Sequence, residues 1–148
     1  MSPHPAAGEP DLMQLDHQLC FALYSSAHAL NRAYKPVLKA LDLTYPQYLA
    51  MIVLWERDGV TVKEVGDRLH LDSGTLTPLL KRLEAVGMIS RERSLDDERR
   101  VIVKLTAKGR KLRDHAGEVT KYVVEAVGMS AEEFAALIQM LMNRVPNI

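Results

Sequence analysis

The sequence of 148 residues has a single cysteine, Cys20, and this scarcity removes two common ways of stabilising a small fold. One thiol cannot form a disulfide within the chain. Four cysteine and histidine ligands at zinc-finger spacing are also missing, and the five histidines show no metal-ligand spacing. We therefore expect no metal and no cofactor, and we interpret the histidines as surface or packing residues.

Long hydrophobic runs are absent as well. No apolar stretch approaches the roughly 18 residues that a membrane-spanning helix needs. Residues 1–9 have neither the basic nor the apolar region of a signal peptide. The composition, 47% hydrophobic and 26% charged, is typical of one globular domain. We expect a single-domain protein of the reducing cytoplasm that does not enter a membrane.

The chain also lacks net charge, because 19 Lys and Arg balance 19 Asp and Glu. This balance argues against a uniformly basic nucleic-acid-binding chain and against an acidic disordered tail. The distribution is uneven, however. Residues 60–114 carry thirteen basic and nine acidic side chains, a net charge of +4, and the remainder carries −4. The middle of the chain can therefore favour phosphate contacts, although an ordinary solvated surface would have the same composition.

The N-terminal third predicts an arm followed by a helix. Residues 1–11 are rich in proline and small residues, which indicates a flexible arm. Apolar residues at helical spacing begin at Leu15, and Asp16 is the expected N-cap of this helix. Pro36 is expected to interrupt the helix or to start a short second one.

The middle of the chain predicts short helices followed by a hairpin. Helices are expected from Tyr45 and from Val62, the latter after a Thr-x-x-Glu capping box, and a third after a turn at 71–73. Two strand-like runs, 88–93 and 101–105, flank a charged loop. Long helices are then predicted after two further capping residues, Thr106 and Ser130.

Helix, turn, helix and charged hairpin, in that order, are typical of a winged helix-turn-helix, a mainly α fold with a small β-hairpin. Such a module sets its second helix in the DNA major groove while the hairpin reaches the neighbouring groove. The alternative is a small α+β domain whose hairpin only covers a core.

The third helix of this module carries a leucine stripe at a period of 3.6 residues and a second face of small and polar residues. The start of a recognition helix is where bases are contacted. The candidate DNA-binding residues here are Asp72, Ser73, Thr75, Thr77 and Lys81. Asp72 or Ser73 could simply cap the helix, and Pro78 would require a late helix start or a local kink.

The loop between the two strands supplies the remaining candidates, Asp97, Arg99 and Arg100. An arginine near a hairpin tip can enter a narrow minor groove, where negative potential is concentrated. Asp97 could orient the Arg99 guanidinium through a charge-assisted pair. The alternative is a surface ion pair worth about 0–1 kcal/mol.

These residues resemble a known family. The pattern Asp97-x-Arg99 followed by Leu105-Thr106 is similar to the wing signature of MarR-type transcriptional regulators. The segments around Leu15–Tyr24, Tyr34–Pro36, Leu43–Tyr48 and Leu71–Lys81 resemble the OhrR subgroup, which are repressors that sense organic hydroperoxides.

The resemblance implies a homodimer that binds a pseudo-palindromic operator in double-stranded DNA. It assigns residues 12–45 to dimerisation and sensing, 46–106 to the winged helix-turn-helix, and 107–148 to C-terminal dimerisation helices. Residues 1–11 remain the arm.

The resemblance also assigns Cys20 as the residue that a peroxide oxidises. A helix N-terminus favours an anion, so a cysteine near one can react as the thiolate. Taken alone, a single cysteine is more often a small buried apolar residue. In the subgroup, tyrosines of the partner subunit donate hydrogen bonds to the thiolate, and the matching residues are Tyr34 and Tyr45, with Tyr24 also in the pattern. Since the chain has no second cysteine, we expect a mixed disulfide with a low-molecular-weight thiol, or overoxidation.

Two other functions fit the sequence. A MarR-type repressor could be released by a small phenolic or aromatic ligand, with Cys20 inert. A thiol peroxidase would need a route back to the thiol, and the sequence offers no resolving cysteine. We therefore expect a regulator and not an enzyme.

Overall fold

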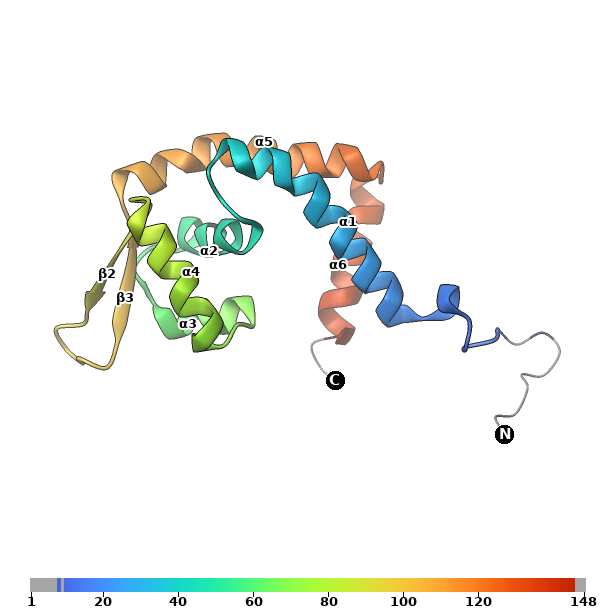
Figure 1. Cartoon of the computed structure of the whole chain (residues 1–148), viewed down its shortest axis with the longest axis horizontal. Coiled ribbons are helices and arrows are strands. Elements are labelled where there is room, and N and C mark those ends of the chain that lie inside the picture. Colours follow the sequence, from blue (N-terminus) through green and yellow to red (C-terminus); the bar gives the residue numbers. More distant parts are fainter. Residues whose placement is uncertain (1–7, 9, 146–148) are drawn as a thin grey trace.

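The computed structural model describes residue 8 and residues 10–145, so most of the predicted arm lies outside the described residues. The elements are a 3-10 helix η1 (Leu15–His17), α1 (Leu19–Ala40), α2 (Tyr45–Glu56), β1 (Val60–Thr61), α3 (Val62–Leu69), α4 (Ser73–Ala85), β2 (Ile89–Arg93), β3 (Val101–Leu105), α5 (Ala107–Val127) and α6 (Ala131–Arg144). Figure 1 shows a lobe of α2, α3, α4 and the sheet, from which α1, α5 and α6 extend to one side. This is the winged helix-turn-helix that the sequence predicts.

The sheet of the lobe has three antiparallel strands in the order β1-β3-β2. β2 and β3 form the predicted hairpin, with Ile89 opposite Leu105 and Arg93 opposite Val101. β1 adds two residues on the other side of β3, with Val60 opposite Val103. β1 could not be predicted from the sequence, because two residues are too few to show the alternation of a strand.

The core lies where α2, α3, α4 and the sheet meet. Met51, Leu54, Val65, Leu80 and Val103 are at most 1% exposed. The four leucines of the predicted stripe on α4 are buried and its last member, Val86, is half-buried, which confirms the orientation of that helix. The opposite face of α4 is therefore left for solvent or DNA.

The start of α1 differs from the prediction. Asp16 is not the N-cap: it lies within η1, and α1 begins at Leu19 with Gln18 as its N-cap residue. The extended backbone of Gln18 separates the two helices, and its side-chain amide donates to the Leu12 carbonyl. Cys20 is consequently the second residue of α1, closer to the helix start than predicted.

Neither internal proline ends a helix. α1 continues through Pro36 to Ala40, and α4 continues through Pro78 to Ala85. Each proline costs one backbone hydrogen bond. Pro36 and Pro78 are exposed, so water can solvate the carbonyl groups left over. The prediction that Pro36 interrupts the helix was wrong for this reason.

A close joint fastens the start of α5 to the winged lobe. The Thr106 side chain caps α5 by accepting from the Gly109 amide at 3.1 Å and donates to the carbonyl groups of Gly87 and Met88. The Trp55 indole of α2 donates to the Gly109 carbonyl at 2.9 Å. A Cβ on Gly109 would lie 2.1 Å from the Met88 oxygen, so only glycine allows this approach. The joint ties α5 to the residue that precedes β2.

Outside the lobe, many apolar side chains are uncovered. Every residue of α6 is at least partly exposed, and Leu38 is the buried residue of α1. Large exposed apolar residues on η1, α1, α5 and α6 include Leu15, Leu19, Tyr24, Tyr122, Leu137, Ile138, Met140 and Met142. Within residues 10–145, no single helix is both long and apolar enough to cross a membrane, although α1 and α2 would pass together as a pair bent by 70°.

Candidate nucleic-acid interface and sensor residues

The N-terminal end of α4 is held by Asp72. Its carboxylate accepts a hydrogen bond from the Thr75 amide at 2.8 Å, which makes Asp72 the N-cap. Hydrogen bonds from Thr75 lower the pKa of the Asp72 carboxyl. Ser73 and Thr75 are exposed beside it, and Thr77 is half-buried one turn further on. Of the two alternatives for the cap, the structure selects Asp72, and it leaves the Ser73 hydroxyl on the surface.

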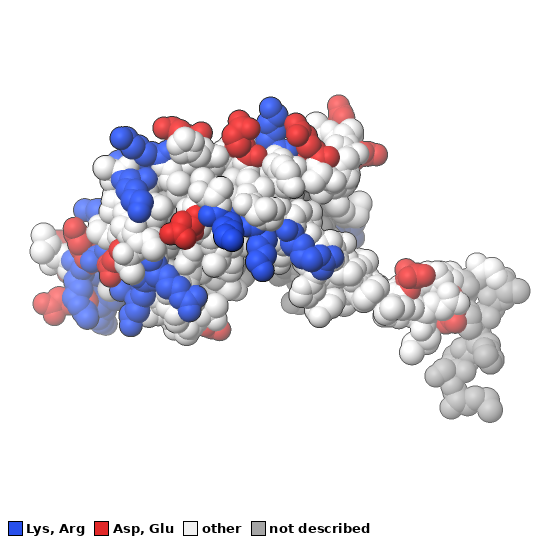
Figure 2. Space-filling model, turned by 45° about the horizontal axis from the view of Figure 1, so that its top comes forward, with Lys and Arg blue, Asp and Glu red and all other residues white. Residues whose placement is uncertain are grey.

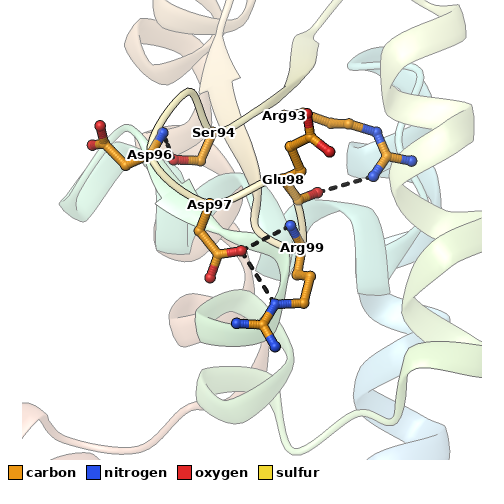
Figure 3. A network of polar contacts seen from close by, with 6 residues as sticks. All are labelled: Arg93, Ser94, Asp96, Asp97, Glu98 and Arg99. Carbon is orange, nitrogen blue, oxygen red and sulfur yellow. Dashed lines mark hydrogen bonds and ion pairs between the residues drawn. The ribbon is translucent and has the colours of Figure 1, made fainter.

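The wing presents Arg99 at its tip (Figure 3). The Arg99 side chain is 91% exposed, and its Nε donates to the Asp97 carboxylate at 3.3 Å. Behind the tip, Arg93 Nη1 donates to the Glu98 carbonyl at 2.9 Å. The Ser94 amide donates to the Arg100 carbonyl at 2.7 Å. These bonds connect the two sides of the loop, while the Arg99 side chain, paired with Asp97 through Nε, stays exposed to solvent.

A groove of about 790 Å³ is lined by α3, the start of α4 and the wing. Five of the eight predicted DNA-binding residues line it: Asp72, Ser73, Thr77, Arg99 and Arg100. Asp97 contacts Arg99 at its edge, whereas Thr75 and Lys81 lie on α4 outside the lining. Figure 2 shows Lys and Arg side chains gathered at the winged end of the molecule, with acidic side chains among them. The folded chain therefore collects most of the predicted set on one surface.

Two further basic residues line this groove that were not predicted as DNA-binding residues, Lys63 and Arg91. Lys63 is engaged by Asp67 at 2.8 Å and Arg91 by Glu84 at 3.2 Å. The sequence did contain a signal for Arg91. Arg91 and Arg93 alternate with Glu92 along β2, which places the two arginines on the same face of that strand.

Cys20 is exposed near the start of α1, far from the groove along the chain. Tyr24 lies one turn further along the helix and is 65% exposed, with its ring centroid 4.5 Å from that of His28. The nearby apolar residues Leu19 and Phe21 are also exposed. Among the described residues, no group of three or more His, Cys, Asp or Glu side chains could hold a metal ion.

The structure brings Tyr34 and Tyr45 together, with ring centroids 4.8 Å apart. Burial, followed by the influence of Tyr45 and Tyr48, raises the pKa of Tyr34 to about 12, and burial also raises the pKa of Tyr45. Both phenols therefore stay protonated and can donate hydrogen bonds at neutral pH. About 21 Å of helix separates Cys20 from Tyr34 at 1.5 Å per residue, so these two side chains of one chain do not form a single site.

A groove between an exposed recognition helix and an arginine-tipped wing defines the class: a winged helix-turn-helix DNA-binding protein. Comparison with known proteins agrees. The sequence profile described as "Transcriptional regulator SarA/Rot" matches residues 32–116.

Curated relatives match over most of the chain. The HTH-type transcriptional regulator TtmR of Methylorubrum extorquens (strain PA1) is 52% identical over 134 residues, which cover 90% of this chain and 69% of TtmR. The organic hydroperoxide resistance transcriptional regulator of Bacillus subtilis (strain 168) is 46% identical over 127 residues, 86% of each chain. The solved structure of reduced AbfR bound to DNA is 33% identical with a TM-score of 0.76, and it covers 91% of this chain and 94% of AbfR.

The chain belongs to the MarR family of transcriptional regulators, with a winged helix-turn-helix of the SarA/Rot type. It is a regulator that binds DNA and not an enzyme.

Proposed function

We propose that this regulator is a repressor that senses organic hydroperoxides through Cys20 and releases its operator when Cys20 is oxidised. The observation that carries the proposal is the exposure of the sole cysteine in the first turn of α1, a helix whose C-terminal part packs on the core of the winged lobe through Leu38. A relative that is 46% identical is named as an organic hydroperoxide resistance regulator. The apolar residues around Cys20 suit a peroxide with an apolar substituent.

The working form is a homodimer in this proposal. One chain leaves large apolar residues of η1, the first half of α1, the end of α5 and α6 exposed. Burying apolar surface is favourable by roughly 25 cal/mol per Å², and a second copy presents a matching face by symmetry. Residues 12–45 and 107–145 then supply the interface, and each winged module (46–106) approaches one half of a pseudo-palindromic operator.

The dimer also resolves the separation of Cys20 from the tyrosine pair. Tyr34 and Tyr45 of one subunit would donate to the Cys20 thiolate of the other, because phenols stabilise an anion without adding positive charge. Tyr24, one turn from Cys20 on the same chain, would complete the set. The raised pKa values of Tyr34 and Tyr45 suit this donor role.

The chemistry begins when the Cys20 thiolate attacks the terminal oxygen of the hydroperoxide. The S–O bond forms as the O–O bond breaks, so the sulfur is oxidised by two electrons to a sulfenic acid, and the alkoxide takes a proton from water and leaves as the alcohol. A low-molecular-weight thiol then attacks that sulfur, releasing water and leaving a mixed disulfide. Either product is larger than the thiolate and breaks the tyrosine hydrogen bonds. Because the C-terminal part of α1 packs on the core of the winged lobe, a shift of α1 would move the two lobes of the dimer out of register with DNA.

The interface with DNA follows from the groove. Ser73, Thr75, Thr77 and Lys81 would meet base edges or phosphates in the major groove, with Asp72 holding the helix start. Arg99 would enter the minor groove, oriented by Asp97, with Arg100 beside it.

Two parallel measurements test the redox step: mass spectrometry of the intact protein, and DNA binding by the same sample. The DNA is a duplex that the unoxidised protein selects from a random-sequence library, called the selected duplex below. After one equivalent of an organic hydroperoxide, we expect Cys20 to gain oxygen, or one small thiol when such a thiol is present, in parallel with release of the duplex. Release without any change of mass at Cys20 would contradict the proposal.

One observation favours a second candidate, a repressor released by a small phenolic or aromatic ligand. A cavity of about 610 Å³ lies between α1, the start of α2 and the end of α4. Apolar and basic side chains line it together, among them Leu38, Tyr45 and Arg82. Release of the duplex by such a compound, with peroxide having no effect, would favour this candidate.

A further inference from the structure

An ion pair joins the recognition helix to the wing at a place that the predicted contact set does not include. Arg91 of β2 donates through Nε to Glu84 Oε2 at 3.4 Å and through Nη2 to Glu84 Oε1 at 3.2 Å. Two parallel bonds between a planar guanidinium and a carboxylate fix orientation as well as distance. The hydrogen bonds from Arg91 lower the pKa of the Glu84 carboxyl, which keeps it charged.

Arg91 and Arg99 line the same groove but differ in exposure. The Arg91 side chain is 21% exposed and that of Arg99 is 91% exposed. Arg99 extends into solvent, while Arg91 lies against the protein with its charge directed at Glu84. A residue that reaches for phosphate would be expected to look like Arg99.

The tip of the wing is already held by its own bonds, from Arg93 to the Glu98 carbonyl and from Ser94 to the Arg100 carbonyl. These bonds and the pairing of β2 with β3 hold the hairpin together internally. At its base it is fixed by Thr106 and by the pairing of β3 with β1, and the fork between Glu84 and Arg91 adds a direct side-chain contact between the hairpin and α4. It also places an acid on the helix that faces DNA, which by electrostatics alone opposes binding.

We propose that Glu84 and Arg91 are positioning residues for DNA binding: their pair sets the spacing between the recognition helix and the wing, so that both reach their grooves at once. Neither residue needs to touch DNA. The proposal rests on the DNA-binding activity of the family and is independent of the redox role of Cys20.

The test uses a prediction of opposite sign to simple electrostatics. Glu84→Gln removes a negative charge near DNA, so charge alone predicts tighter binding. We expect instead that it weakens binding to the selected duplex by about three- to tenfold, the effect of losing one charge-assisted pair. Binding to a random-sequence duplex of the same length should stay equal or become slightly tighter.

Two further variants separate positioning from contact. Arg91→Gln should weaken binding to the selected duplex similarly while leaving the slope of log affinity against log salt unchanged; a lost phosphate contact would reduce that slope by about 0.9. The double variant that exchanges the pair, Glu84→Arg with Arg91→Glu, should bind the selected duplex more tightly than the summed losses of Glu84→Arg alone and Arg91→Glu alone predict.

Glu92→Gln is the matched control, because Glu92 lies on the same strand and pairs with Lys104 within the hairpin at 3.6 Å. It should not lower the affinity for the selected duplex. Circular dichroism and thermal unfolding of each variant check that the fold is intact. Equal or tighter binding by Glu84→Gln, or a reduced salt slope for Arg91→Gln, would overturn the proposal.

Discussion

The joint between α5 and the winged lobe gives a prediction in which one substitution has opposite effects at two positions of one helix. Gly109 and Gly117 both lie in α5. A Cβ at Gly109 would be 2.1 Å from the Met88 oxygen and 3.1 Å from its carbonyl carbon, whereas a Cβ at Gly117 would have nothing within 4 Å. Gly109→Ala therefore forces the backbone apart, and Gly117→Ala does not.

The magnitudes follow from two opposing effects. Replacing glycine by alanine within a helix stabilises by roughly 0.5–1 kcal/mol. Overpacking costs about 1–3 kcal/mol, and more where backbone must move. We expect Gly109→Ala to lower the free energy of unfolding by about 1–2 kcal/mol net, and Gly117→Ala to raise it. At roughly 2–4 °C per kcal/mol, the two melting temperatures should move apart in opposite directions.

Thermal unfolding followed by circular dichroism, at one fixed protein concentration, measures both effects. Gly109→Ala should also weaken DNA binding, because Met88 immediately precedes β2 and its carbonyl accepts from the Thr106 amide at 3.0 Å. If both variants gain stability equally, the close approach between α5 and Met88 is refuted, and with it the joint.

Three other predictions follow from single contacts. Arg99→Ala should weaken DNA binding and reduce the salt slope by about 0.9; an unchanged affinity in a salt titration would show that the wing does not reach a groove. Tyr34→Phe and Tyr45→Phe should each slow the oxidation of Cys20, measured by quenching the reaction with an organic hydroperoxide at successive times; unaltered rates would show that the phenols do not assist the thiolate. The pKa of Tyr34 is about 12 in the folded state and 10.0 for an unperturbed tyrosine. Between these values the unfolded state therefore binds fewer protons than the folded state. Stability should thus fall as pH rises from 10 to 12, and denaturant unfolding should show a smaller fall for Tyr34→Phe.

The parts of the fold that depend on local sequence could be predicted. Asp72 and Thr106 each cap a helix through a hydrogen bond to the amide three residues ahead, and that pattern is visible in the sequence. The leucine stripe of α4 is buried because its period alone decides which face meets the core. The Thr44–Gln47 capping box of α2 had the same signature and was overlooked.

The parts that depend on how the elements pack or on backbone outside regular helices could not be predicted. Asp16 is of a residue type that favours an N-cap, but residues 15–17 form a 3-10 helix and α1 begins after the extended Gln18. The fork between Glu84 and Arg91 and the approach of Gly109 to Met88 arise only when the wing folds back on α4 and α5. The closeness of Tyr34 and Tyr45 likewise needs α2 to fold back against α1.

The central claim, that oxidation of Cys20 controls DNA binding, is tested most directly by fluorescence anisotropy of the selected duplex during addition of an organic hydroperoxide. The native protein should release the duplex at about one equivalent of peroxide, while Cys20→Ser should bind with similar affinity and stay bound. Equal release from both proteins, or no release from either, would contradict the account.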